Sequence, residues 1–297
     1  MIVATTRAEL KAARDKVASP VVLVPTMGAL HEGHRALLRR ARELAGPAGT
    51  VAVSIFVNPL QFGPNEDLDK YPRTRAEDLE ICEAEQVGLV FAPDVAEMYP
   101  QEQLVMVDPG PTGEILEGEF RPGFFHGVLT VVLKMFSLVR PDTAVFGQKD
   151  AQQLALVRRM VADFALGIEI EAVPTVRDAD GLALSSRNKY LSASERKVAP
   201  VLHQALSAGV AVAARGPRAV LDAARRVLDE EGAHLSVDYL AVVSGGTYEP
   251  VRNDDFSGPA VLAIAARLGI TRLIDNMPVQ IGVGTANPGW QSDAADD

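Results

Sequence analysis

The chain has 297 residues, of which 47% are hydrophobic and 23% are charged, and its formal net charge is −10. This length and composition are typical of a globular protein with two domains, and the acidic balance argues against a surface that binds nucleic acid or an anionic membrane. Cys82 is the only cysteine, so we expect no intramolecular disulfide, and the first residues lack the pattern of a signal peptide. We therefore expect a cytoplasmic protein with no membrane-spanning segment.

The first part of the chain alternates apolar runs with segments of helical spacing. Strands are expected at 21–24, 51–57, 87–93, 104–107, 143–147 and 168–173, and helices after 34, at about 75–86, at about 124–139 and from 148. A strand, a helix and a further strand in succession require parallel pairing with a right-handed crossover. The sequence thus predicts an α/β fold with a doubly wound, Rossmann-like parallel sheet, whose ligands lie at the carboxyl ends of the strands where the strand order reverses.

The pattern changes at about residue 177. Helical stretches at 194–214 and 217–230 are followed by short apolar runs at 239–243 and 262–265. We therefore predict a Rossmann-like domain at 1–176 and a smaller α+β domain at 177–284 that acts as a lid. The polar, acidic residues 285–297 are expected to form a disordered tail.

The first candidate site is the segment 25–34, which follows the expected strand at 21–24. Its glycines let the backbone approach a ligand, and His31 and His34 share the first turn of the next helix, where N–H groups and the helix dipole favour an anion. A metal site is disfavoured because no third ligand has suitable spacing, and a purely structural histidine pair is the alternative. We expect phosphate, and we predict that this turn is the centre of an ATP site.

The second candidate is the segment 147–153, at the carboxyl end of another expected strand. It would therefore lie at the same edge of the sheet as the two histidines. There Lys149 suits phosphate, Asp150 suits ribose hydroxyls, and Gln153 offers donors and acceptors. The alternative is a solvated start of a helix.

The third candidate, 185–188, lies at the joint between the domains and carries two hydroxyls and a guanidinium. An ordinary polar turn is the alternative, but beside an ATP site these groups are expected to close on phosphates. The sequence contains no Walker A loop, no dinucleotide-binding glycine fingerprint and no nucleophile elbow.

Together, and in this order, these motifs resemble the pantoate–β-alanine ligase family of the nucleotidyltransferase superfamily, whose signature is His-x-Gly-His. The resemblance runs from Val21 to about Gly282 and rests on the segments 25–34, 58–62, 71–73, 121–123, 147–153 and 184–188. It implies ATP-dependent condensation of pantoate with β-alanine through a pantoyl adenylate, giving pantothenate, AMP and pyrophosphate. It also implies Mg²⁺ and a cytoplasmic homodimer.

The resemblance further implies roles for individual residues. The catalytic set would be His31, His34, Lys149 and Arg187. The ATP-binding set would be Met27, Gly33, His34, Gly147, Lys149, Asp150, Val176, Leu184, Ser185, Ser186 and Arg187. The pantoate-binding set would be Met27, Gln61 and Gln153, and Mg²⁺ would be held mainly through the ATP phosphates, without a protein metal site.

One departure from the family pattern is visible. Family members often carry a histidine where this chain has Phe124, and the histidine here is His126, two places later, so we assign His126 no role. Two other functions stay open on the sequence alone. They are a nucleotidyltransferase that retains the nucleotide in its product and a nucleotide-binding module without turnover.

Overall fold

The computed structural model describes residues 1–64, 66–230 and 235–282. They form two compact units, and we call 1–148 together with 152–174 unit 1, and 149–151 together with the chain from 175 unit 2. The domain limits expected from the sequence, 1–176 and 177–284, stay a prediction, and the expected tail at 285–297 lies outside the described residues.

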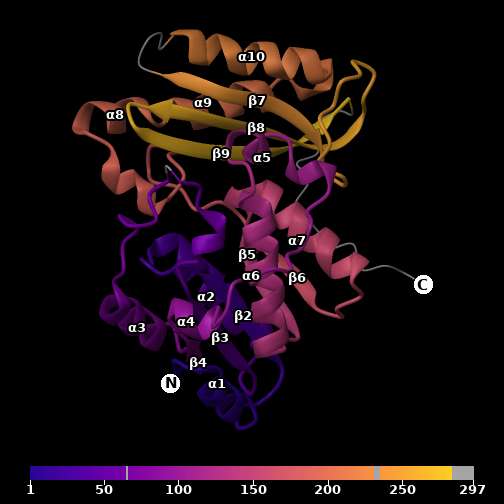
Figure 1. The fold of residues 1–297 in the computed structure, drawn as a ribbon. Coiled ribbons are helices and arrows are strands. Elements are labelled where there is room, and N and C mark those ends of the chain that lie inside the picture. The colour runs from indigo at the N-terminus through magenta and orange to yellow at the C-terminus, as the bar shows by residue number, and fades with distance from the viewer. Residues whose placement is uncertain (65, 231–234, 283–297) are drawn as a thin grey trace. The chain divides into compact units, whose positions relative to one another are not determined.

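Unit 1 contains, within the described residues, a six-stranded parallel sheet (Figure 1). Its strands are β1 (Ile2–Ala4), β2 (Val21–Thr26), β3 (Thr50–Ile55), β4 (Leu89–Phe91), β5 (Thr143–Gly147) and β6 (Glu169–Val173). The strand order is β1-β4-β3-β2-β5-β6. The chain runs from β2 outwards to β4 and then continues on the other side with β5 and β6, so the order reverses between β2 and β5. The predicted doubly wound sheet is confirmed.

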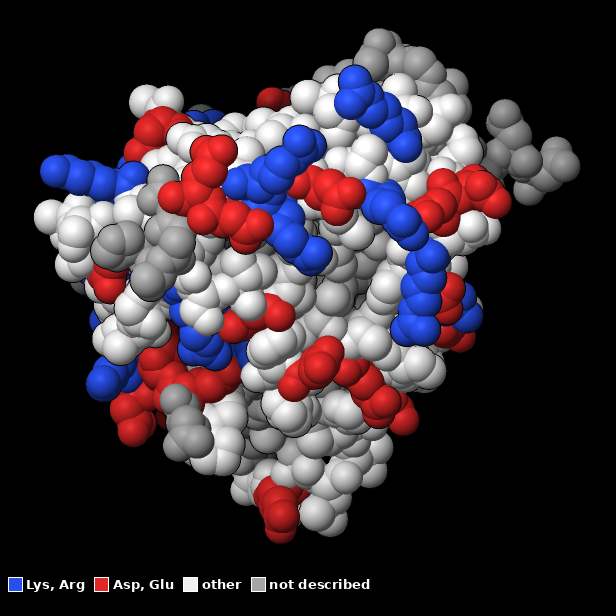
Figure 2. Space-filling model, turned by 90° about the horizontal axis from the view of Figure 1, so that it is seen from above, with Lys and Arg blue, Asp and Glu red and all other residues white. Residues whose placement is uncertain are grey.

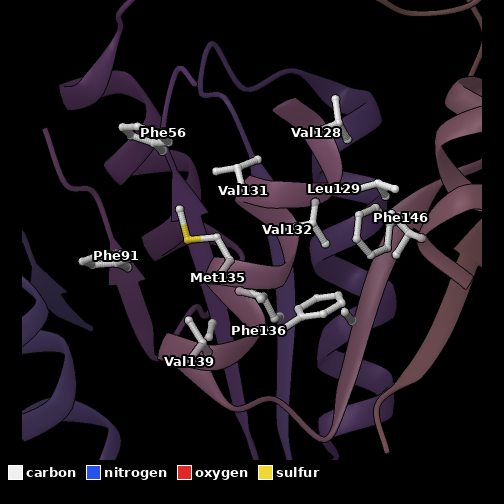
Figure 3. Close-up of a cluster of buried hydrophobic side chains, with 14 of the residues drawn as sticks. Phe56, Phe91, Val128, Leu129, Val131, Val132, Met135, Phe136, Val139 and Phe146 are labelled. Atoms are coloured by element: carbon white, nitrogen blue, oxygen red, sulfur yellow. The ribbon is translucent and has the colours of Figure 1, made fainter. Parts of the chain in front are cut away.

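Helices cover both faces of this sheet. They are α1 (Arg7–Arg14), α2 (Glu32–Ala45), α3 (Arg75–Ala84), α4 (Val95–Met98), α5 (Glu117–Phe120), α6 (Phe124–Val139) and α7 (Ala151–Asp163), with short 3₁₀ turns η1 (Pro59–Gln61), η2 (Pro111–Gly113) and η3 (Gln148–Asp150). Alternate strand residues point to opposite faces, so Leu23 packs in a cluster with α1, α6 and α7, whereas Val22 and Val24 pack in a cluster with α2 and α3. Figure 3 shows Met135 and Phe136 of α6 in the first of these clusters.

Helix α6 approaches η1 closely at one glycine. A Cβ atom on Gly127 would overlap the carbonyl oxygen of Leu60, so only glycine permits this contact. The position of η1, and of Gln61 within it, therefore depends on the packing of α6.

Unit 2 is built on a three-stranded antiparallel sheet within the described residues. Its strands are β7 (Ser236–Ser244), β8 (Gly258–Leu268) and β9 (Thr271–Ile281), and its helical segments are η4 (Ser186–Tyr190), α8 (Ala193–Val198), α9 (Val201–Val210), η5 (Ala213–Arg215) and α10 (Pro217–Glu230). Helices α9 and α10 pack on the sheet, and Leu206 of α9 and Leu262 of β8 are fully buried in the shared core. The smaller α+β fold expected for this part of the chain is confirmed.

Some expected elements differ from the structure. The strand expected at 104–107 is wrong, because this segment pairs with no strand of the described chain, and Leu104 and Val105 are 81% and 82% exposed. An apolar run becomes a strand only when a neighbour supplies hydrogen-bond partners. The helix expected at 194–214 is divided into α8, α9 and η5. Strands β1 and β9 and helix α1 were not predicted.

The surface carries charges of both signs. On the face drawn in Figure 2, Lys and Arg side chains lie beside Asp and Glu side chains rather than in one continuous basic patch. In unit 2, for example, Arg196 pairs with Asp178 and Asp180, and Arg218 pairs with Asp254. Across the parts of the chain that are described, no helix is both long and apolar enough to cross a membrane.

The contact between α6 and η1 gives a prediction. We expect Gly127→Ala to lower the free energy of unfolding by about 1–3 kcal/mol, because the added methyl overlaps the Leu60 carbonyl and the helix must shift. Urea denaturation measures this change. Gly63→Ala in the same unit is the control, since its Cβ would lie 3.8 Å from the nearest atom, on Glu66. Equal stability of the two variants would contradict the close packing.

Candidate active site

The turn between β2 and α2 lies at the point where the strand order reverses, and it has an unusual backbone. Gly28 and Ala29 both have left-handed backbone angles, with φ of 84° and 51°, which costs energy for alanine. The buried carboxylate of Asp78, on α3, stabilises this conformation, because Oδ2 accepts from the Ala29 N–H at 3.1 Å and Oδ1 from the Leu30 N–H at 2.8 Å. A Cβ on Gly28 would lie 2.9 Å from Asp78 Oδ2, so glycine is required there.

Asp78 also affects its neighbour Cys82. Burial, with a further contribution from the charge of Asp78, raises the pKa of the Cys82 thiol to about 12. The thiol therefore stays protonated at neutral pH and is no nucleophile. The function of Asp78 was not predicted, because an acidic residue inside a helix carries no local signal of a contact with a turn 48 residues away in the sequence.

The two histidines cap the start of α2. Nδ1 of His31 accepts from the Gly33 N–H at 3.1 Å, and Nδ1 of His34 accepts from the His31 N–H at 3.2 Å. This is a reciprocal capping box made by two imidazoles. A ring nitrogen that accepts a hydrogen bond carries no hydrogen, so the neutral rings have theirs on Nε2. Each ring therefore presents an N–H donor close to the helix N-terminus, where an anion is favoured.

The amide of Gln61 is oriented by Asn58. The buried Asn58 side chain donates from Nδ2 to Gln61 Oε1 at 3.0 Å and accepts on Oδ1 from the Tyr99 hydroxyl at 2.8 Å. Because Oε1 of Gln61 faces Asn58, its amide nitrogen faces Met27, with 3.2 Å between Nε2 and Sδ. The structure thus brings together Met27 and Gln61, which the resemblance assigned to pantoate. Asn58 and Tyr99 were not predicted, although Asn58 begins the quoted motif 58–62.

Phe124 has its own contacts. The Arg121 guanidinium lies 3.6 Å from the centroid of the Phe124 ring, pairs with the carboxylate of Glu66 and donates to the Gln61 carbonyl at 3.3 Å. An aromatic ring stabilises a cation in this position. His126 lies 3.9 Å from Asp108, and its side chain is 40% exposed. Phe124 therefore contacts the arginine that binds the Gln61 carbonyl.

The carboxyl end of β5 lies beside α2. A Cβ on Gly147 would be 3.9 Å from a methyl of Leu37, one turn after His34. Gln153 is half-buried near the start of α7. The neighbouring Gln152 is buried and connects α7 to the segment before α5, since its side chain donates to the carbonyls of residues 112 and 115 and accepts from the N–H of residue 117.

The remaining candidate residues belong to unit 2. The side chain of Lys149 is 20% exposed and its Nζ lies 3.9 Å from Asp150. The Leu184 N–H donates to the Val176 carbonyl at 2.9 Å, and the Ser185 hydroxyl caps η4 by accepting from the Arg187 N–H. Ser186 is the first residue of η4.

The candidate residues therefore form two local groups, one in each unit. Met27, Gly33, Gln61, Gly147, Gln153 and the two histidines belong to unit 1, and Lys149, Asp150, Val176 and 184–187 belong to unit 2. That both groups bind one ATP molecule stays a prediction.

Comparison with known proteins decides the family. The family model described as pantoate-beta-alanine ligase matches residues 2–278. The chain belongs to this family. A pantothenate synthetase from Thermobifida fusca is 59% identical over 289 residues, which cover 94% of this chain and 96% of that protein. Another, from Acidothermus cellulolyticus, is 55% identical over 283 residues, covering 94% of this chain and 92% of that protein.

Solved structures agree with this assignment. The crystal structure of pantothenate synthetase from Thermus thermophilus matches with a TM-score of 0.87 and 46% identity over 93% of this chain and 99% of that one. The pantoate-beta-alanine ligase from Francisella tularensis, complexed with beta-gamma ATP and beta-alanine, matches with a TM-score of 0.76 and 32% identity over 93% of this chain and 97% of that one.

The predicted activity follows from this membership. The chain is an enzyme, and the prediction that it condenses pantoate with β-alanine using ATP is confirmed. None of the relatives and structures named above is described by either of the two other functions that the sequence alone left open.

The contacts of Asp78 give a second prediction. In Asp78→Asn an amide NH₂ faces one of the two turn N–H groups, so we expect a loss of about 1–3 kcal/mol in the free energy of unfolding and a higher KM for ATP, because the histidine cap loses its support. Denaturation and steady-state kinetics measure the two effects. The exposed Glu80, also on α3, gives the control Glu80→Gln. Unchanged stability and KM in Asp78→Asn would show that the carboxylate is not needed.

Proposed function

We propose that the reaction proceeds in two steps through a pantoyl adenylate. In the first step the pantoate carboxylate attacks the α-phosphorus of ATP, and the bond to the leaving pyrophosphate breaks. In the second step the β-alanine amine attacks the acyl carbon, the bond to the AMP oxygen breaks, and the amine loses a proton as pantothenate forms. Support comes from membership of the ligase family and from the relative that was crystallised with an ATP analogue and β-alanine.

The observation that carries this proposal is the histidine capping box. His31 and His34 present Nε2–H donors beside the N-terminus of α2, where the strand order reverses. The first step joins two anions, so its transition state needs donors that stabilise charge on phosphate oxygens. Two neutral donors held by the backbone provide such stabilisation without reorganising during the reaction.

Unit 2 would supply the cations. We propose that Lys149, Arg187, Ser185 and Ser186 bind the phosphates. The nucleoside would lie against Gly33, Gly147, Asp150, Val176 and Leu184. The local hydrogen bonds of Ser185 and Leu184 support this, because they fix the backbone on which these side chains stand. Unit 2 would thereby act as the lid that excludes water from the adenylate.

The proposed pantoate site uses side-chain amides. Gln61, whose amide nitrogen faces Met27, and Gln153 would bind pantoate oxygens. Neutral amides suit this substrate because they bind hydroxyl and carboxylate oxygens without adding a negative charge beside the nucleophile.

Mg²⁺ would be held mainly through ATP phosphate oxygens. The side chains proposed for the phosphates are N–H, ammonium and hydroxyl groups, which suit phosphate, whereas Mg²⁺ prefers oxygen ligands and retains several waters. Bound in this way, the ion would supply charge neutralisation on the phosphates. We also propose that the enzyme acts in the cytoplasm, as the sequence leads us to expect.

Pyrophosphate exchange tests the adenylation step. We expect exchange of labelled pyrophosphate into ATP with pantoate and without β-alanine, and release of AMP once β-alanine is added. Lys149→Ala is expected to slow exchange by about 10²–10³-fold, because a cation on the transferred phosphates is lost. Its unfolding free energy should change by less than about 0.5 kcal/mol.

The control is Lys197→Ala, which removes an exposed lysine of α8. Near-normal exchange in Lys149→Ala would overturn the role of this lysine. Exchange that does not depend on pantoate would overturn the adenylate.

We propose in addition that the enzyme is a homodimer and that the segment 104–107 contributes to its interface. Leu104 and Val105 are more than four-fifths exposed, and they are consecutive apolar residues in a segment that is not paired with another strand among the described residues. Contiguous exposed apolar side chains mark interaction surfaces. A second copy of the chain would bury them.

Val105→Asp tests this interface. We expect a shift from dimer to monomer at micromolar concentration in sedimentation velocity, because the interface would have to bury a charge. The control is Ile270→Asp, since Ile270 is 91% exposed at the turn between β8 and β9. A Val105→Asp protein that stays dimeric would exclude this segment.

A further inference from the structure

The backbone of Lys149 is held by a strand of the C-terminal sheet. Asn276, in β9, is 4% exposed, and its Nδ2 donates to the Lys149 carbonyl at 2.9 Å. The two residues are separated by 127 positions in the sequence and both belong to unit 2. A carbonyl held in this way restricts the peptide on which the lysine side chain stands.

Asn276 is fixed in turn by a buried ion pair. Arg177 and Asp275 make two hydrogen bonds of 2.6 and 2.9 Å, and Asp275 is almost fully buried. Asp275 Oδ1 also accepts from the Asn276 N–H at 2.8 Å, and Arg177 donates to the Asn276 carbonyl at 3.3 Å. Both polar groups of the Asn276 backbone are therefore bound by this pair.

The same arginine holds the segment that leads to Ser185. Arg177 donates from its side chain to the Gly181 carbonyl at 3.1 Å, and its backbone forms an antiparallel bridge with Ala183. Leu184 follows directly, with its N–H bonded to the Val176 carbonyl. One ion pair thus supports two stretches of chain, the peptide of Lys149 and the approach to 185–187.

We propose that Asn276 is a positioning residue for Lys149, and that the Arg177–Asp275 pair sets Lys149 and the segment 185–187 in a fixed arrangement for phosphate binding. The inference rests on the proposed function, in which these residues bind the ATP phosphates. Asparagine suits this position because its amide donates to a carbonyl, whereas an aspartate would place a second carboxylate beside Asp275 and repel the carbonyl oxygen.

The inference predicts an effect on rate more than on binding. A lysine that stabilises charge in the transition state must be aligned, and a displacement of about 1 Å can cost about 10²-fold in rate. Without Asn276 the lysine keeps its charge and still attracts ATP, but it is no longer held in place. We therefore expect kcat to fall more than KM for ATP rises.

A double-mutant cycle tests this. Asn276→Ala, Lys149→Ala and the double variant are compared in pantoate-dependent pyrophosphate exchange. We expect Asn276→Ala to slow exchange by about tenfold or more, and we expect the double variant to be within about twofold of Lys149→Ala, because Asn276 has nothing left to position. The control is Thr271→Val, which changes another buried β9 residue, 4% exposed, and should leave the rate unchanged.

The outcomes are distinct. Two results overturn this inference and leave the proposed function intact. One is a double variant whose loss of exchange rate is the product of the two single losses, and the other is a normal rate in Asn276→Ala. A normal rate in Lys149→Ala overturns the role of Lys149 and the inference with it. Where thermal unfolding shows that Asn276→Ala does not fold, Asn276→Ser, whose hydroxyl is too short to reach the Lys149 carbonyl, takes its place in the same cycle.

Discussion

The buried carboxylate of Asp78 accepts hydrogen bonds from two successive N–H groups and so holds the turn that follows β2, and the histidine part of unit 1's candidate site depends on these two bonds. The turn sets where α2 begins, and the start of α2 sets the positions of His31 and His34. The histidines are then oriented by backbone N–H groups. The buried carboxylate of Asp78 thus acts through the turn and the start of α2. It determines the direction in which the N–H donors of the two histidine rings point.

Unit 2 follows the same physical scheme with different residues. The carboxylate of Asp275 is satisfied by Arg177 and by a backbone N–H, and its neighbour Asn276 binds the peptide of Lys149. A buried pair of this kind adds little net stability, because desolvation opposes the attraction, but removal of either partner is strongly destabilising because it leaves an uncompensated buried charge. In both units a buried carboxylate fixes the backbone, and the backbone fixes the groups proposed to bind phosphate.

The sequence predicted the parts of the structure that local pattern controls. Helix α6 and strand β5 have the expected bounds, because continuous apolar spacing over 124–139 and 143–147 is a local property. The strand expected at 104–107 does not form, because a strand needs a neighbouring strand that supplies hydrogen-bond partners, and the sequence pattern does not show whether one is present. β9 was missed because it includes the buried polar residues Asp275 and Asn276. Asp78 was missed because its partners are far away in the sequence.

The chain of amides beside Met27 has a consequence for selectivity. The Tyr99 hydroxyl donates to Asn58 Oδ1, so the Asn58 amide has one orientation, and Asn58 then donates to Gln61 Oε1. Burial raises the pKa of Tyr99, so this hydroxyl keeps its proton at any physiological pH. Through Asn58, the Tyr99 hydroxyl thereby determines which end of the Gln61 amide accepts and which end donates. In the proposed pantoate site Gln61 would therefore donate to oxygen atoms of the bound acid, and a molecule that offers an N–H at that place would bind less well.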